Sequence, residues 1–287
     1  FRTNPAYGQL SKTPSKLEIA WNVPTGSLPK GEGGNYTGTW TGSGWTGQPI
    51  LVKWPDATRK IMNLYDAAKA KTGLIEAIYA TMDGNIYFID AETGEATRKK
   101  INIGVPFKGA GSLDPRGYPV LYLGSGDHYK TAGKESRAMA INLIDGSVLF
   151  TFGKKMDSFA LRDWHAYDSS ALVDAKSDTL LYPGENGILY RVKLNTKYDE
   201  TAGTLTMTPD APVKMRYSAK RTREDGYWLG YEGSAVGWRN YLFLTENSGL
   251  MQCIDVNTMK PVWVQDIWDD TNATAVFEED RKNLTAY

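Results

Sequence analysis

The chain has 287 residues, of which 41% are hydrophobic and 23% are charged. This composition supports a buried core and argues against an intrinsically disordered chain. The 33 basic residues balance the 33 acidic residues. The net charge therefore gives no general attraction to nucleic acid or to an anionic membrane, and no nucleic-acid partner is predicted.

Three further features concern membrane insertion, export and the reactivity of the cysteine. No run of the sequence approaches the roughly 18 apolar residues of a membrane-spanning helix, so no transmembrane segment is predicted. The chain opens at Phe1 without a signal peptide, so we expect an upstream segment. The single cysteine, Cys253, lies beside Met251 and Ile254 and is predicted to be buried and unreactive.

The N-terminal half contains one isolated strand pattern and one repeat unit. Residues 16–26, KLEIAWNVPTG, predict a strand at 17–23 that carries Trp21. The first unit spans about residues 45–100, with strand patterns in GQPILVKW, LIEAIYATM and GNIYFIDAETGE.

A helix is predicted within the first unit, around residues 56–72. Ile61, Leu64, Tyr65 and Ala68 follow the spacing i, i+3, i+4, i+7, which is typical of an amphipathic helix. Asp56 is suited to cap its start, and a glycine stands at its end. We expect this helix to pack against its own unit on one face of the molecule.

Three more units follow, near residues 105–155, 165–217 and 231–268. Each contains two strands joined by a tight turn, a third strand after a turn that contains glycine, and then an outer strand. The first turns of these units are predicted at residues 114–117, 174–178 and 238–240. Residues 271–287 have the pattern of the first hairpin of a fifth, partial unit.

The units repeat a common ending. Asp90 and Asp255 lie in nearly identical stretches 165 residues apart, which is three periods of 55. Asp145 and Asn195 are predicted to hold the corresponding positions in the units between. A lone four-stranded meander has two apolar faces, and radial stacking of such sheets buries both of them. The sequence therefore predicts an all-β fold, a β-propeller of four-stranded antiparallel blades with one inserted helix.

The stretch YFIDAETG, together with the outer-strand Trp263, resembles the pyrroloquinoline-quinone-type, or quinoprotein-like, propeller repeat. The resemblance covers about residues 45–267. It implies that Asp90 and Thr93 bond the turn backbone, that Gly94 takes a positive φ, and that Trp263 docks between adjacent sheets. Propellers of this kind close by pairing an N-terminal outer strand with the last blade. Because the last blade here lacks its middle strands, we expect one propeller domain over residues 1–287, truncated at the C-terminus.

The resemblance also implies a chemistry that the residues do not repeat. Enzymes of the family hold the quinone on the propeller axis with calcium, and many have a vicinal disulfide over it. One cysteine cannot form that disulfide, and no ligand motif matches. No catalytic residue is therefore predicted, and neither Ca²⁺ nor the quinone is predicted as a bound cofactor.

Polar residues at the starts of the innermost strands are predicted to line the central channel. They either bond water at a crowded axis or contact a ligand. The candidates are Gln48, Ser112, Ser170, Ser234 and Thr274, with Asp168 and Glu232 just before two of them. Asp168 and Glu232 are also the one pair that could serve a carbohydrate-active propeller, which needs two carboxylates about 5 to 9.5 Å apart.

The loop DWHAYD supplies the candidate metal ligands Asp163, His165 and Asp168. Loop carboxylates suit Ca²⁺ better than Zn²⁺, because the spacing provides no set of three or four convergent nitrogen or sulfur ligands. The alternative is that His165 is an ordinary polar residue of the loop.

Aromatic residues gather just before the inner strands and are predicted to share one face. Exposed Trp and Tyr suit sugar rings or protein hot spots, whereas buried ones would cover the core between blades. The residues are Trp40, Trp45, Trp164, Tyr167, Tyr227, Trp228 and Tyr231.

These patterns support three functional hypotheses. The leading one is a non-enzymatic, exported propeller, periplasmic, cell-surface or secreted, that binds protein or glycan on one face as a scaffold. The second is a quinone- and calcium-dependent alcohol or sugar dehydrogenase. The third is a carbohydrate-binding or carbohydrate-active propeller.

Overall fold

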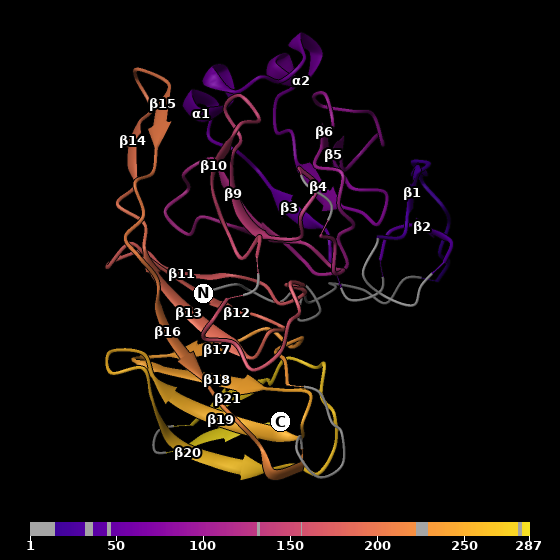
Figure 1. Ribbon diagram of the computed structural model, residues 1–287. Helices are drawn as coiled ribbons and strands as arrows, with labels where there is room; N and C mark the ends of the chain where they lie inside the picture. The colour runs from indigo at the N-terminus through magenta and orange to yellow at the C-terminus, as the bar shows by residue number, and fades with distance from the viewer. Residues whose placement is uncertain are drawn as a thin grey trace.

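The computed structural model describes residues 15–31, 37–44, 47–130, 133–155, 157–221, 229–280 and 283–287, and four of its sheets have four antiparallel strands each (Figure 1). Sheet 1 contains β3 (Ile50–Val52), β4 (Glu76–Ala80), β5 (Asn85–Asp90) and β6 (Ile101–Asn102). Sheet 2 contains β7 (Ser112–Leu113), β8 (Val120–Gly124), β9 (Ala138–Asn142) and β10 (Val148–Phe152). Sheet 3 contains β11 (Leu172–Asp174), β12 (Thr179–Pro183), β13 (Ile188–Lys193) and β16 (Val213–Arg216). Sheet 4 contains β17 (Val236–Trp238), β18 (Tyr241–Thr245), β19 (Leu250–Asp255) and β20 (Lys260–Asp266).

The strands of each sheet follow one another in chain order, so every sheet is a meander, as the turn pattern predicts. Three two-stranded hairpins accompany the sheets: β1 (Ser27–Pro29) with β2 (Thr39–Thr41), β14 (Lys197–Asp199) with β15 (Thr204–Thr206), and β21 (Phe277–Glu279) with β22 (Leu284–Ala286). The last of these stands where the sequence predicts the hairpin of a partial unit.

The core lies between the sheets, and the second strands β8 and β12 each contribute to two core layers. Leu121 and Leu123 of β8 pack into the cluster shared with sheet 1, whereas Val120 and Tyr122 pack into the cluster shared with sheet 3. Leu181 of β12 turns in the same way toward sheet 4. Because side chains alternate across a strand, one apolar strand can bury both of its faces only when sheets stack on each side. This is the reason that β8, VLYLG, is buried along its whole length.

The pairing register corrects the predicted period. Cross-strand partners place Asn142, opposite Val120, in the position that Asp90 holds opposite Glu76. Lys193 holds that position in sheet 3 and Asp255 in sheet 4. The predicted equivalence of Asp145 and Asn195 is therefore wrong. The turns before the third strands differ in length, so the units do not share a constant spacing.

The turn after β5 has the predicted geometry. The N–H of Glu92 donates to the Asp90 carboxylate over 2.9 Å, and the N–H of Glu95 donates to the Thr93 hydroxyl over 3.3 Å. Gly94 has a φ of 77°, which a residue with a side chain rarely adopts. Trp263, in contrast, does not dock between sheets as predicted, because it is 42% exposed on β20, with its ring centroid 6.0 Å from that of Phe243.

The strand predicted at residues 17–23 is also wrong, because these residues form no strand in the structure. The segment is instead attached to sheet 1 by a side chain. The indole Nε1 of Trp21 donates to the carbonyl of Ala91 over 3.1 Å, and the ring packs against Gly94.

The predicted single helix is two short helices, α1 (Asp56–Ile61) and α2 (Asp66–Ala70). Between them the backbone is extended at Met62, and Met62 and Leu64 are buried in the core between sheets 1 and 2. The chain leaves the helix because these apolar side chains enter the core. Asp56 makes no cap hydrogen bond and pairs instead with Arg59 at 2.7 Å.

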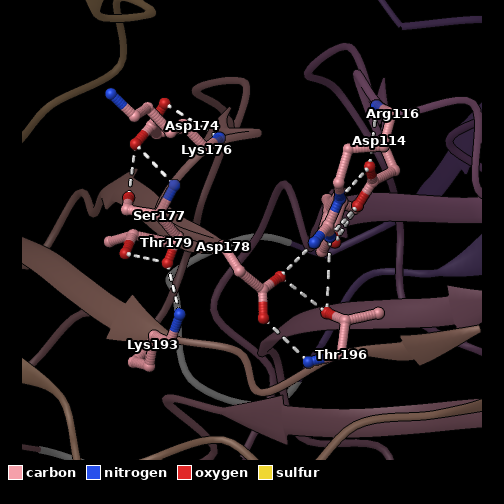
Figure 2. A network of polar contacts seen from close by, with 10 residues as sticks. Asp114, Arg116, Asp174, Lys176, Ser177, Asp178, Thr179, Lys193 and Thr196 are labelled. Carbon is pink, nitrogen blue, oxygen red and sulfur yellow. Dashed lines mark hydrogen bonds and ion pairs between the residues drawn. The ribbon is translucent and has the colours of Figure 1, made fainter.

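A guanidinium joins sheet 2 to sheet 3 at the turns between the first and second strands of each sheet (Figure 2). Arg116 lies between Asp114 of its own turn and Asp178 of the next sheet, at 2.6 Å from each carboxylate. Asp178 also accepts hydrogen bonds from the N–H and the hydroxyl of Thr196. The hairpin β14–β15 extends to α1, where the hydroxyl of Thr58 donates to Glu200 over 2.7 Å (Figure 1).

Candidate binding site at the hairpin face

One end of the four sheets collects the segments that carry the predicted site residues. In a four-stranded meander, the turn between the second and third strands lies at the same end as the segment that enters the first strand. We call this end the hairpin face. It contains the turns 81–84, 125–130, 184–187 and 246–249 and the entering segments 105–111, 165–171 and 229–235.

Each entering segment places one aromatic ring between two sheets. Phe107, Tyr167 and Tyr231 are at most 1% exposed. The backbone N–H of each donates to a carbonyl in the turn of the preceding sheet, namely Thr81 (3.2 Å), Ser125 (2.7 Å) and Gly184 (3.2 Å). The rings therefore hold neighbouring sheets together.

This position corrects part of the predicted aromatic face. Tyr167 and Tyr231 belong to the core and are not available to a partner. Trp45, Tyr227 and Trp228 lie outside the described residues. Trp40 and Trp164 remain at the surface of the hairpin face, and both are half-buried.

A charged residue follows each buried aromatic: Lys108, Asp168 and Glu232. Burial raises the pKa of Asp168, Lys108 opposes this shift and Glu232 and Asp127 add to it, and the net pKa is about 7. The charges of Lys108 and Glu232, which enter the sheets on either side, therefore both act on Asp168. Sequence reasoning found the two acids but missed Lys108, although the pattern of an aromatic, a charged and a small residue marks all three.

The two surface tryptophans are anchored in the same way. The indole Nε1 of Trp40 donates to Asp127 over 2.7 Å, and that of Trp164 donates to Glu185 over 2.6 Å. Both acids lie in turns between second and third strands. Burial raises the pKa of Glu185 well above its ordinary value, and the charges of Asp168 and Glu232 act in the same direction.

Cations and an imidazole cover the indole rings. The Nζ of Lys30 lies 4.2 Å from the centroid of Trp40, and the guanidinium of Arg162 lies 4.7 Å from that of Trp164. The ring of His128 stacks on Trp164, with centroids 4.8 Å apart and planes 8° apart. Such contacts stabilise a Trp at the surface and occupy its faces.

The predicted metal ligands do not converge. Asp163 pairs with Lys130 at 2.7 Å and with His165 at 3.1 Å, whereas Asp168 is buried beside Glu185. The backbone N–H of His165 donates to the Nδ1 of His128 over 3.0 Å. Burial of His128 and the nearby His165 lower the pKa of the His128 imidazole to about 4. Within the described residues, no group of three or more His, Cys, Asp or Glu could hold a metal ion. These residues therefore do not fit the calcium and quinone site that the family resemblance implies.

The small polar residues of the inner strands bond neighbouring sheets to each other. Ser112 donates to the carbonyl of Ala171 over 2.8 Å. The N–H of Ser170 donates to Ser234 over 2.9 Å, and that of Ser234 donates to Thr274 over 3.2 Å. Gln48 lines a cavity of about 10 Å³, which holds no more than a water molecule. A role of these residues in lining a channel stays a prediction.

Comparison with known proteins rests on structure, because no family model and no curated protein sequence matches the chain. The crystal structure of BamB from Moraxella catarrhalis aligns with 94% of this chain and 69% of its own, at 16% identity and a TM-score of 0.47. The structure of Saccharomyces cerevisiae Sqt1 aligns with 77% of this chain and 52% of its own, at 14% identity and a TM-score of 0.50. Both proteins are β-propellers.

The chain has a β-propeller fold. Sheets 1 to 4 are its blades, and the buried aromatics of the hairpin face lie between them. The chain spans about half the length of Sqt1, and identities this low concern the fold alone. Among the described helices of the propeller, none has the length and apolar character needed to cross a bilayer.

Proposed function

We propose that this propeller is a non-enzymatic scaffold that is exported and binds a protein partner on its hairpin face. The observation that carries the proposal is the paired anchoring of Trp40 on Asp127 and of Trp164 on Glu185. Tryptophans held rigidly at a surface, with arginine and lysine beside them, have the composition of protein-binding hot spots.

The same geometry favours a protein over a glycan. A sugar ring stacks on an open aromatic face, whereas Lys30 covers Trp40 and Arg162 covers Trp164. A protein partner can use the mixed aromatic and charged edge without displacing these cations.

A scaffold of the quinoprotein-like type fits the residues better than an enzyme does. The Asp90–Thr93 turn makes the backbone hydrogen bonds that the resemblance to the family repeat implies, which supports this part of the proposal. Catalysis by the pair Asp168 and Glu232 would require both carboxylates to reach a sugar, but Asp168 is only 7% exposed. Export is compatible with Cys253, which is buried and whose thiol pKa is raised by that burial, so no reducing compartment is needed to protect it.

The test combines site-directed photo-cross-linking with an enzyme assay. Leu161 lies three residues before Trp164 and is 50% exposed, so a benzoylphenylalanine placed there should capture the partner. The matched control is the same group at Glu95, an exposed position in the turn after β5, at the opposite end of its blade. The proposal requires an adduct at Leu161 and none at Glu95. Adducts of equal yield at both positions, or reduction of a dye with quinone, Ca²⁺ and alcohols, would contradict it.

A further inference from the structure

A groove beside Trp40 lies at the edge of the hairpin face, between the hairpin β1–β2 and the turn 81–84 of blade 1. Its volume is about 380 Å³, which falls within the roughly 300 to 1,000 Å³ of ligand-binding clefts. The groove has an aromatic wall, a basic side chain and a border of exposed hydroxyl residues. The residues that line it include Lys30, Thr39, Trp40, Thr41, Ser43 and Met82.

The hairpin β1–β2 is attached to two blades, so the groove has a fixed wall. On the side of blade 1, the backbone N–H of Met82 donates to the carbonyl of Gly42 over 3.1 Å. On the side of blade 2, the hydroxyl of Tyr129 donates to the carbonyl of Pro29. A groove held in this way keeps its shape before a partner arrives, which lowers the entropic cost of binding.

Trp40 is itself held in one position within the groove. It pairs with Leu28 across the hairpin, and both side chains pack on the core between blades 1 and 2. Its indole Nε1 donates to one oxygen of Asp127 over 2.7 Å, and the other oxygen accepts the N–H of His128 over 2.8 Å. Asp127 is 6% exposed, so this carboxylate orients the ring and contributes almost no surface to the groove.

Two lysines extend toward the same indole. The Nζ of Lys30 lies 4.2 Å from the centroid of the Trp40 ring, and the Nζ of Lys108 lies 5.1 Å from it. Lys30 follows β1 and Lys108 lies in the segment that enters blade 2, so the fold brings together two charges that are far apart in the sequence. Because like charges repel, an anion placed between the two ammonium groups is attracted by both of them.

We propose that the groove beside Lys30 and Lys108 binds a glutamate or aspartate side chain of the partner protein. This inference rests on the proposed function and names the chemistry of the partner's contact. A carboxylate has two oxygens and can accept charge-assisted hydrogen bonds from two ammonium groups at once. The methylene groups of such a side chain can pack on the Trp40 ring, whereas a cationic side chain would be repelled by both lysines.

The test follows the indole N–H signal of Trp40 by heteronuclear NMR at low salt, with Trp40→Phe used to assign the signal. One probe is an acetylated and amidated hexapeptide that alternates glycine and glutamate; the other carries glutamine, a neutral isostere, in place of glutamate. The titrations compare the parent protein with Lys30→Gln, Lys108→Gln and Lys60→Gln. Lys60 is exposed on α1, at the opposite end of blade 1, so Lys60→Gln removes the same charge and is the matched control.

The expected result is a saturable shift of the Trp40 signal with the glutamate peptide and none with the glutamine peptide. Lys30→Gln and Lys108→Gln should each weaken the affinity by about fivefold or more, and Lys60→Gln by less than about twofold. Equal shifts with the two peptides, or equal losses in Lys30→Gln and Lys60→Gln, would overturn the inference. So would sodium phosphate that shifts the signal as far as the glutamate peptide does, because the groove would then bind any small anion.

The two proposals can fail separately. If the partner still cross-links at Leu161 but the glutamate peptide does not bind, the scaffold stands and the carboxylate site is wrong. If the adduct at Leu161 is absent as well, the hairpin face is not the binding face. Circular dichroism of each variant, compared with the parent protein, shows that a lost affinity is not a lost fold.

Discussion

The indole Nε1 of Trp164 donates a hydrogen bond of 2.6 Å to the carboxylate of Glu185. The bond connects the segment that enters blade 3 to the turn between the second and third strands of that blade. Trp40 and Asp127 make the same kind of bond at blade 2. A hydrogen bond from a half-buried tryptophan to a buried carboxylate therefore occurs twice on this face.

Replacing Trp164 with Phe keeps a ring and removes the indole donor. We expect the free energy of unfolding to fall by about 1 to 3 kcal/mol, because the buried Glu185 carboxylate would lose a partner that it cannot replace with water. Urea denaturation followed by circular dichroism measures the change. Trp263→Phe is the control, since Trp263 is 42% exposed, and its effect should stay near 0.5 kcal/mol. Equal effects of the two substitutions would show that the indole bond adds nothing to stability.

Asp168 should make stability depend on pH with a defined sign. Its pKa in the folded protein is about 7, above the ordinary value of 3.8, because burial disfavours its charge. The folded protein therefore retains a proton that the unfolded chain loses between these two values. The contribution of Asp168 to stability is greatest below about pH 3.8 and decreases as pH rises to about 7.

The substitution Asp168→Asn removes this titration. Relative to the parent protein, the variant should gain stability steadily from pH 4 to pH 7 and show a constant difference above that range. Urea midpoints of both proteins across this range provide the measurement. A difference that does not change with pH would mean that Asp168 titrates normally.

The sequence predicts the blades better than it predicts the site. Alternating apolar strands and tight turns depend on local residues, so the four meanders and the turn at Asp90 could be read directly. The register of the repeat could not be predicted in this way. Asn142 stands in place of Asp in the turn of blade 2, and the connecting loops vary in length. The helix break at Met62 was also hidden, since a residue that leaves a helix to enter the core keeps the same apolar spacing.

The site depends on contacts between blades, which no local pattern records. An aromatic before an inner strand looks the same whether it is exposed, as Trp164 partly is, or buried, as Tyr167 is. The burial of Tyr167 depends on the preceding blade, because the Ser125 carbonyl of that blade accepts a hydrogen bond from the backbone N–H of Tyr167. Lys108 was overlooked because its equivalence to Asp168 becomes visible only once the strands of blades 2 and 3 are aligned.

The buried ion pair of blade 1 should be sensitive to the loss of one partner. Glu76 and Arg98 are 0% and 2% exposed at their side chains and lie 2.6 Å apart. Trp54 also donates to Glu76 over 2.9 Å. Glu76→Gln would leave a buried guanidinium without a counter-charge, and we expect a loss of about 3 to 5 kcal/mol in the free energy of unfolding.

A double replacement separates charge from packing at this pair. Glu76→Leu combined with Arg98→Met removes both charges and retains much of the volume, so it should recover most of the stability lost by Glu76→Gln. Thermal unfolding of the two variants makes the comparison. If the double variant is no more stable than Glu76→Gln, the hydrogen bonds of the pair, and not its unpaired charge, account for the effect.

The segments that enter blades 2 and 3 approach each other closely at Gly109, which has no side chain. A Cβ atom built on Gly109 would lie 1.8 Å from the backbone carbonyl oxygen of Asp168, and a backbone atom cannot rotate away as a flexible side chain can. Gly109→Ala should therefore separate the two entering segments and lower the free energy of unfolding by about 3 kcal/mol or more. Gly237→Ala is the matched control, because the nearest atom to its Cβ, Leu172 Cδ1, lies 4.0 Å away. We expect the control to change stability by less than about 1 kcal/mol.

Hydrogen exchange at the Tyr167 amide adds a local readout. In Gly109→Ala the protection of this amide should fall before global unfolding, because its bond to Ser125 belongs to the same junction. Full protection in a destabilised variant would place the disturbance elsewhere and show that blades 2 and 3 tolerate a methyl group between them.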